Sequence, residues 1–448
     1  MKQKSFNEPN QELNAIIVYG LRIGGALLAF ILQIFLARWI GHSEYGLFAF
    51  VWASLIIVGE ILNFGYYNLI QRLIQEYGVK QDKDHLRGAI WSSAIIVACV
   101  SILVALLSVL TLYGLWHTEI ISQKFAIPLM IAALALPAFA LSDYISGLGR
   151  AYGAMISAFA PTALLRPLVI ISLLAGLASF SLTLNAVTAM MVATIAIWLS
   201  LAVAILITKN KIPHEHLKGP RQVQLQSWFW AALPMMLISG FELLLFNIDV
   251  LMISMFLPTD QTGIYFAAAK IMALVAFINF AVGSAFNAAF AKHSAAGEQT
   301  ALAGVIHWSA SLTFYPSIIA LLLIYLCKVP LLSLFGPAYI EASFVVLPLC
   351  LGLLLRALVG PGERILMMSG QHYLCAALYL GAVILDMLLN AILIPQYGIG
   401  GAAVATALSF SVMALALLIT IRTRLGIWAL PFLPHQMIGK LKSKALGF

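Results

Sequence analysis

Charged side chains interrupt the apolar runs of this sequence, at positions where a membrane-spanning helix would have lipid around it. These residues are Arg22, Glu60, Asp143, Arg166, Glu242, Asp249, Lys270, Arg356, Glu363 and Asp386. A charge costs roughly 2.5–3.5 kcal/mol at the centre of a spanning helix, so the set would cost about 25–35 kcal/mol facing lipid. Because that exceeds the folding free energy of a typical domain, we expect them to face one another or a hydrated interior. There they could bind ions and charged ligands.

Four members of the set are cations that suit an anionic ligand: Arg22, Arg166, Lys270 and Arg356. Arginine presents a planar fork of donors that matches phosphate and carboxylate oxygens. Arg166 and Arg356 lie near the middle of their apolar runs, so we expect both to contact an anionic head group. Arg22 and Lys270 are expected closer to the two ends of the hydrated interior, where a ligand would enter.

Three carboxylates, Glu60, Glu242 and Asp386, lie at middle depth and could bind a cation. A carboxylate that loses an arginine partner to an incoming anion can take up a cation instead. Glu242 lies seven residues before Asp249, so a continuous helix would align both into a polar track. The alternative is that Glu242 merely pairs with Arg22.

The sequence offers no pattern for catalysis. Its four cysteines lie in or beside apolar runs without CxxC or CxH spacing, so neither a metal site nor a disulfide framework is expected. No Ser/His/Asp or Cys/His constellation is visible. We therefore expect no enzyme and no cofactor. The net charge of +8 is explained by basic loops, so a nucleic-acid partner is not expected either.

Composition identifies the elements that must hold these charges. Hydrophobic types make up 62% of the 448 residues and charged types only 9%, against roughly 25% charged residues in soluble domains. Apolar runs of about 20 residues predict spanning helices. They lie near 15–39, 47–74, 88–113, 125–149, 151–178, 185–208, 228–257, 263–291, 308–327, 344–368, 373–394 and 400–421. The fold class is therefore an all-α membrane protein with about twelve transmembrane helices.

Lysine and arginine predict the orientation. The loops near 76–87 and 209–226 and the tail after 421 carry clusters of basic residues. With an even number of spans, the opposite side holds only Arg38, Lys124 and Lys328. Because basic residues mark cytoplasmic loops, both termini are predicted to be cytoplasmic, in a multi-pass protein of the cell inner (plasma) membrane.

The two halves of the chain resemble each other. Trp39–Ala49 (WIGHSEYGLFA) and Phe256–Ala267 (FLPTDQTGIYFA) each place a short polar turn between long apolar runs, and align Gly46 with Gly263. Six spans per copy make the repeats parallel in topology. We predict two pseudo-symmetric six-helix lobes at 1–208 and 228–421, a cytoplasmic linker at 209–227 and a basic cytoplasmic tail at 422–448.

Several segments resemble a known family. LARWIGHSEYGLFAF at 36–50 and ILNFGYYNLIQRLIQE at 61–76 are similar to the first hairpin of O-antigen and exopolysaccharide flippases. These belong to the multidrug/oligosaccharidyl-lipid/polysaccharide exporter superfamily. The Asp249–Lys270 hairpin, LFGPAYIEAS at 334–343 and IPQYGIGGAAVATALS at 394–409 also fit.

That resemblance implies two lobes around a central cavity that opens alternately to each side. It implies a substrate of oligosaccharide joined by pyrophosphate to a polyprenol. It also implies exchange of this substrate for a coupling ion, H⁺ or Na⁺, and makes Glu60, Glu242 and Asp386 the candidates for binding that ion. The substrate would be moved to the outer leaflet for surface polysaccharide such as lipopolysaccharide, with polysaccharide polymerase machinery as a partner.

Two other functions stay open at this point. A drug/cation antiporter of the same superfamily would favour an acidic or aromatic cavity, whereas this sequence supplies buried cations. A membrane polysaccharide polymerase or ligase would need a sizeable outer loop for its sugar site. The largest outer loop expected here is only about 328–343.

Overall fold

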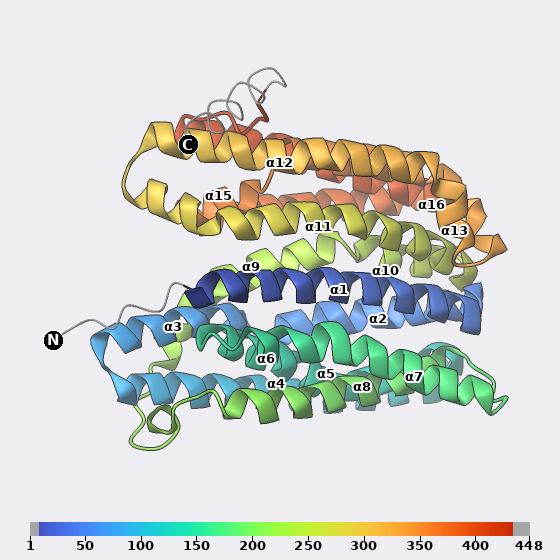
Figure 1. The fold of residues 1–448 in the computed structure, drawn as a ribbon. Coiled ribbons are helices and arrows are strands. Elements are labelled where there is room, and N and C mark those ends of the chain that lie inside the picture. Colours follow the sequence, from blue (N-terminus) through green and yellow to red (C-terminus); the bar gives the residue numbers. More distant parts are fainter. Residues whose placement is uncertain (1–8, 433–448) are drawn as a thin grey trace. The chain divides into compact units, whose positions relative to one another are not determined.

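The computed structural model describes residues 9–432, with side chains from residue 20 onward, and every regular element in that part is a helix (Figure 1). The chain forms two compact units. Unit 1 runs to Leu243 and includes Pro258–Gly263. Unit 2 consists of Leu244–Leu257 and the chain from Ile264 onward. The all-helical fold predicted from the apolar runs is confirmed.

Unit 1 is built around α5, whose buried face is lined by small residues. Its helices are α1 (Pro9–Ile40), α2 (His42–Leu62), α3 (Tyr66–Lys80), α4 (Lys83–His117), α5 (Gln123–Ala151), α6 (Met155–Ala160), the π-helix η1 (Pro161–Leu165), α7 (Arg166–Ser179), α8 (Ala186–Lys209), the 3₁₀ turn η2 (His214–His216) and most of α9 (Leu225–Leu245). α5 packs against α2, α3, α4 and α8. Ala135, Ala138 and Ala140 are fully buried there, and small residues of this kind let helix backbones approach closely within a membrane.

Unit 2 is organised around the longest helix. Its elements are α10 (Ile248–Phe256), α11 (Thr259–Ala295, beginning in unit 1), α12 (Gln299–Leu326), α13 (Lys328–Ser333), the 3₁₀ segment η3 (Pro337–Phe344), α14 (Val346–Leu358), α15 (Gly362–Met368) and α16 (His372–Leu425). α16 packs against α10, α14 and α15. It therefore brings together residues distant in the sequence.

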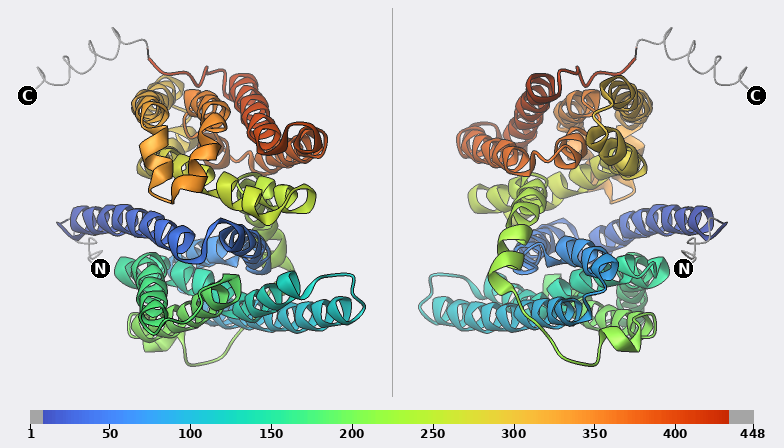
Figure 2. Two further views of the ribbon diagram at one scale, coloured as in Figure 1. Left: turned by 90° about the vertical axis from the view of Figure 1, so that its right-hand side faces the viewer. Right: turned by 90° about the vertical axis from the view of Figure 1, so that its left-hand side faces the viewer.

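Within the described residues, eleven helical stretches are long and apolar enough to cross a bilayer. One is α16, whose 54 residues would extend about 80 Å at 1.5 Å per residue, against a hydrocarbon core of about 30 Å. Gly398 interrupts α16 with φ 59° and ψ −142°, and Figure 2 shows two separate helical segments in this red part of the chain. Because each segment is long enough to span alone, the structure agrees with about twelve spans.

The polar track predicted from Glu242 to Asp249 is wrong. α9 ends at Leu245 and α10 begins at Ile248, with Asn247 between them at a non-helical φ of −130°. Glu242 belongs to unit 1 and Asp249 to unit 2. The two carboxylates therefore do not share a continuous helix face.

The two glycines aligned in the sequence repeat contact each other within unit 1. A Cβ atom on Gly46 would lie 1.7 Å from the Thr259 carbonyl oxygen, and one on Gly263 would lie 2.3 Å from that of His42. The hydroxyls of Ser43 and Thr259 lie 3.0 Å apart beside them. Only glycine allows this close crossing of α2 with the start of α11.

The lobe and linker bounds at 1–208, 209–227 and 228–421 stay predictions. Of the predicted tail at 422–448, residues 433–448 lie outside the described part of the chain.

Candidate functional site

Arg166 opens α7 in unit 1, directly after the π-helical turn η1. Its guanidinium lies 5.3 Å from the centre of the Phe139 ring, and its Nε lies 3.4 Å from the Ser200 hydroxyl. Its Nη2 is buried without a hydrogen-bond partner in the described structure, while Asp143 acts on it electrostatically. Arg166 thus keeps a buried donor available for an anionic ligand.

The irregular backbone before Arg166 also determines where Arg22 lies. The π-helical turn begins at Pro161, which has no amide hydrogen to donate, and such turns are frequent at functional sites. A Cβ atom on Gly25 would lie 2.7 Å from Ala163 Cβ, so α1 crosses this turn closely. One turn earlier on α1, the Arg22 guanidinium lies 4.3 Å over the Phe159 ring. Cation–π contact of this kind holds a cation at a wall that is otherwise apolar.

Carboxylates surround these arginines in the same unit. Arg150 lies 5.9 Å from the Phe159 ring centre, on the ring that Arg22 also covers. Asp143 interacts electrostatically with both Arg150 and Arg166. Glu60 interacts in turn with Asp143, Arg150 and Glu242. Four of the predicted residues, Arg22, Arg166, Glu60 and Glu242, therefore belong to one network in unit 1, which we call the arginine cluster together with Asp143 and Arg150.

A different polar centre lies in unit 2, at Asp249 of α10. Its Oδ2 accepts hydrogen bonds from the Tyr265 hydroxyl at 2.6 Å and the Thr406 hydroxyl at 2.5 Å. Its Oδ1 accepts one from the Asn390 amide at 2.8 Å. Asp386 lies close enough to interact with Asp249 electrostatically and is itself 0% exposed. We call these five residues the acid cluster.

The acid cluster holds more buried acceptors than donors. Within the described structure, both carboxylate oxygens of Asp386 and the side-chain oxygen of Asn390 have no hydrogen-bond partner. Two buried carboxylates this close cannot both remain charged without a compensating positive charge. Such a set of oxygens can accept one proton or coordinate one hard cation.

Sequence reasoning identified Asp386 and Asp249 as charges inside apolar runs, but it did not bring them together and it missed Asn390, Thr406 and Tyr265. The available signal was the spacing of Asp386 and Asn390, four residues apart on one helix face. Nothing in the sequence pointed to Thr406 or to Tyr265.

Two predicted cations lie in unit 2, in different surroundings. Arg356 is 7% exposed, and its Nη2 donates to Glu363 Oε2 at 2.7 Å and to the Tyr379 hydroxyl at 3.2 Å. Lys270 places its Nζ 4.3 Å over the Phe266 ring. The head-group roles predicted for both stay predictions, and Arg356 already has a buried counter-charge.

The fold defines the class of protein. It is similar to an inward-facing multidrug resistance transporter of the MATE family in the MOP superfamily, with a TM-score of 0.71 and 14% identity, over 92% of this chain and 98% of that one. It is also similar to the lipid II flippase MurJ in an inward closed conformation, with a TM-score of 0.70 and 14% identity, over 91% and 87% of the two chains. The protein is thus a multi-pass membrane protein with the fold shared by these transporters.

The family follows from the sequence comparison. Residues 13–292 match the model of the polysaccharide biosynthesis protein family, which is more than half of the chain, so the protein belongs to this family. A relative from Haloferax volcanii, described as "Probable low-salt glycan biosynthesis flippase Agl15", is 27% identical over 405 residues, covering 89% of this chain and 81% of the relative. The chain is thus similar in sequence to a protein described as a flippase and in fold to a transporter.

Proposed function

We propose that this protein is a flippase that moves polyprenyl-pyrophosphate-linked oligosaccharide from the cytoplasmic to the outer leaflet by alternating access. The product would feed surface polysaccharide synthesis such as O-antigen or exopolysaccharide, handed on to polymerase machinery. Family membership and the flippase relative support a glycan-related lipid as cargo. The observation that carries the proposal is the buried Nη2 of Arg166 in unit 1, which has no hydrogen-bond partner among the described residues.

The chemistry of such a substrate matches the arginine cluster. An oligosaccharide pyrophosphate cannot enter about 30 Å of hydrocarbon without losing its hydration. Arginine donors replace that hydration for the pyrophosphate, since guanidinium groups bind phosphate oxygens in pairs. The polyprenol needs no such replacement and can stay in lipid. We assign Arg166 and Arg22 to the pyrophosphate, and keep Lys270 and Arg356 as further candidates.

Coupling is the second part of the proposal. We assign the binding of H⁺ or Na⁺ to Asp386 together with Asp249, because this pair has buried oxygens in excess of its donors. Glu60 and Glu242 remain candidates through their electrostatic link to the arginine cluster. An ion that neutralises the acid cluster would favour one conformation over the other, which is what coupling requires.

The proposed orientation places both termini in the cytoplasm of the cell inner membrane. Reporter fusions at Asp82, Glu215 and Gly447, the last outside the described residues, should read as cytoplasmic. Fusions at Asp260 and Ala338 should read as external. Two or more reversed signals would contradict the orientation.

The flippase itself is tested by locating its substrate. In a deletion strain, sugar-loaded polyprenyl pyrophosphate should accumulate on the cytoplasmic leaflet, protected from an impermeant glycosidase, and surface polymer should be absent. Restoring the wild-type protein should expose the lipid to the enzyme. If the loaded lipid reaches the outer leaflet without the protein and only fails to polymerise, a polymerase or ligase role replaces the flippase. If glycolipid distribution is unchanged and drug efflux is lost, the protein is an antiporter.

A further inference from the structure

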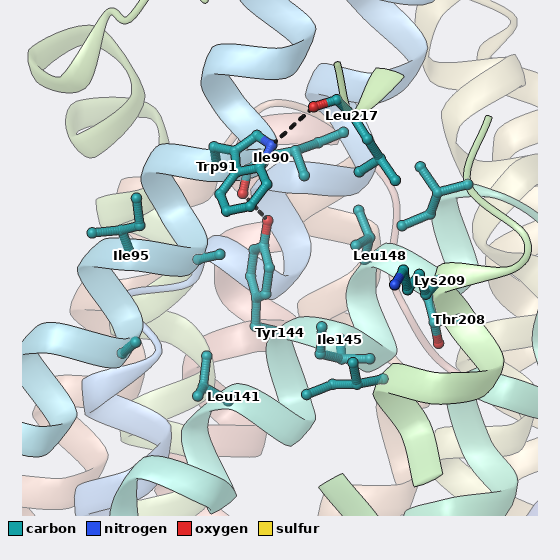
Figure 3. A pocket seen from close by; sticks show the side chains of 14 residues that line it. Ile90, Trp91, Ile95, Leu141, Tyr144, Ile145, Leu148, Thr208, Lys209 and Leu217 are labelled. Carbon is teal, nitrogen blue, oxygen red and sulfur yellow. Dashed lines mark hydrogen bonds between the residues drawn. The ribbon is translucent and has the colours of Figure 1, made fainter. Parts of the chain in front are cut away.

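An apolar cavity of about 440 Å³ opens on unit 1 between α4, α5, α8 and the loop after α8 (Figure 3). Its wall includes Ile95, Ala98, Leu141, Ile145 and Ile205. Ile95 is 51% exposed and Ile205 41%, as expected for side chains on a lipid-facing surface. Because an apolar cavity is a poor site for water, a hydrocarbon chain is the occupant that this wall suits.

Two residues with polar side chains, Thr208 and Lys209, lie at one end of the cavity. Thr208 is 1% exposed, and its Oγ1 has no hydrogen-bond partner in the described structure. The adjacent Lys209 is exposed and takes part in none of the ion pairs found among the described residues. A buried hydroxyl without a partner is costly, so a ligand atom that accepts its proton would be stabilising.

The other polar groups at the cavity are already satisfied. The Tyr144 hydroxyl donates to the Ile90 carbonyl at 2.8 Å, and the Trp91 indole donates to the Leu217 carbonyl at 3.3 Å. Figure 3 shows Thr208 and Lys209 across the cavity from Trp91 and Ile95. Thr208 and Lys209 are therefore the groups on this wall that remain for a ligand.

The segment that borders this end is basic. Between Thr208 and Arg221 the sequence has Lys209, Lys211, Lys218 and Arg221, against a single acid, Glu215. Glu215 forms an ion pair with Lys83, whose Nζ lies 2.6 Å from the Glu215 Oε2. Arg221 lies 4.4 Å over the Trp91 ring, on the wall opposite Thr208. The surroundings of Thr208 thus favour an anionic head group.

We propose that this cavity binds an anionic phospholipid of the surrounding bilayer, with one acyl chain inside and the phosphate at Thr208 and Lys209. The Thr208 hydroxyl donates to a phosphate oxygen and the Lys209 ammonium compensates its charge. The lining residues include no member of the arginine cluster, which favours a bilayer lipid over the tail of the transported one. The site would make the stability of the protein depend on head-group charge.

Native mass spectrometry of the purified full-length protein tests this proposal. The protein is incubated with equal amounts of phosphatidylglycerol and phosphatidylcholine of the same chain length. Wild type should retain phosphatidylglycerol preferentially. Lys209→Gln should lower that preference about fivefold, since one lysine near a lipid surface contributes about 1 kcal/mol. Thr208→Val should lower it as well, whereas Lys211→Gln, in the same loop but outside the cavity wall, should lower it less than Lys209→Gln does.

The acyl-chain part of the proposal is tested by filling the cavity. Ala94→Phe, and the milder Ala98→Leu, each replace a lining methyl by a larger apolar group, and should abolish the retained lipid in protein that still elutes as a folded species. Equal retention of the two phospholipids by wild type overturns the proposal. So does undiminished phosphatidylglycerol in both filled variants, or its displacement by polyprenyl phosphate at equal concentration. If the filled variants do not fold, the Lys209→Gln and Lys211→Gln comparison decides alone.

Discussion

Arg166 in unit 1 and Arg356 in unit 2 have the same side chain at similar depth in an apolar run, yet the structure gives them different surroundings. Arg356 donates hydrogen bonds to the Glu363 carboxylate, the Tyr379 hydroxyl and the Gly360 carbonyl. Arg166 keeps a buried nitrogen without a hydrogen-bond partner in the described structure. A satisfied buried pair contributes to one conformation, whereas an open donor can bind a ligand and release it. Residue type and depth therefore do not define a binding residue.

The same contrast extends to the two clusters. The arginine cluster of unit 1 combines cations, aromatic rings and carboxylates, which suits an anion. The acid cluster of unit 2 has carboxylate and amide oxygens and hydroxyl donors, which suits a proton or hard cation. The exchange proposed above, of an anionic lipid for a cation, assigns one ligand to each of these centres. The predictions below test whether that division of roles holds.

The largest effect is expected at Arg166. Arg166→Ala should reduce flipping more than about thirtyfold, since truncating one partner of a buried charge pair costs about 2–5 kcal/mol. Arg166→Lys should restore part of it, because a lysine keeps the charge but loses the fork of donors. Flipping is measured in proteoliposomes by access of an impermeant glycosidase to the lipid-linked sugar. Full flipping by Arg166→Ala at normal membrane levels would remove this residue from the substrate site.

Arg356 should show a stability effect instead. Arg356→Ala leaves Glu363 buried without its counter-charge, which costs about 3–5 kcal/mol. Thermal unfolding in detergent should show a clearly lowered Tm, and the double variant Arg356→Met/Glu363→Leu should recover most of it. If Arg356→Ala keeps the wild-type Tm but does not flip substrate, Arg356 has the head-group role predicted from the sequence. The distinction drawn here between a structural Arg356 and a ligand-binding Arg166 would then be wrong.

The acid cluster should control the response to an ion gradient. In inverted vesicles, Asp386→Asn should reduce gradient-driven transport to the level seen without a pH or Na⁺ gradient, because an amide cannot exchange a proton or offer charge to a cation. Asp249→Asn should do the same, and Asp260→Asn, which changes a carboxylate outside the cluster, serves as the control. Loss of the gradient response in Glu242→Gln or Glu60→Gln, with Asp386→Asn unaffected, would move coupling to unit 1.

The glycine contact should respond to a single methyl group. Gly46→Ala places a Cβ atom 1.7 Å from the Thr259 carbonyl oxygen, so backbone must shift, at a cost of about 1–3 kcal/mol for overpacking. Gly304→Ala is the matched control, because a Cβ atom there would meet no described atom within 4 Å outside its own helical turn. We expect a lowered Tm only for Gly46→Ala. Equal Tm values for the two variants would show that α2 and α11 do not cross this closely.

The smallest effect is expected at the start of α4. Asp82 caps this helix by accepting from the His85 amide at 3.1 Å, and this hydrogen bond lowers the pKa of Asp82 below its ordinary value. The cap therefore stabilises the protein above the ordinary pKa, and its contribution is lost as pH falls through the lowered one. Asp82→Ala should lower Tm slightly at neutral pH, and the difference from wild type should vanish in acid. A difference that grows in acid would contradict this assignment.

The sequence alone determined the helical class and the approximate number of spans. A helix that crosses a bilayer must be long and apolar, with its backbone groups hydrogen-bonded within the helix. Each span can therefore be recognised from about 20 consecutive residues of the sequence. The charges inside these runs were equally visible, as were the repeat glycines Gly46 and Gly263. All of these features depend on residues close together in the chain or on direct comparison of its two halves.

Only the tertiary structure decided which charges meet. The acid cluster draws Asp249, Tyr265 and Thr406 from three helices, and no spacing predicts which faces of those helices pack together. The break at Asn247 separated Glu242 from Asp249, although their seven-residue spacing predicted one helix face. The partner of Arg356 depends likewise on the turn at Gly360 that brings Glu363 back toward it. A buried charge is defined by its neighbours, and these are fixed by helix packing rather than by the local sequence.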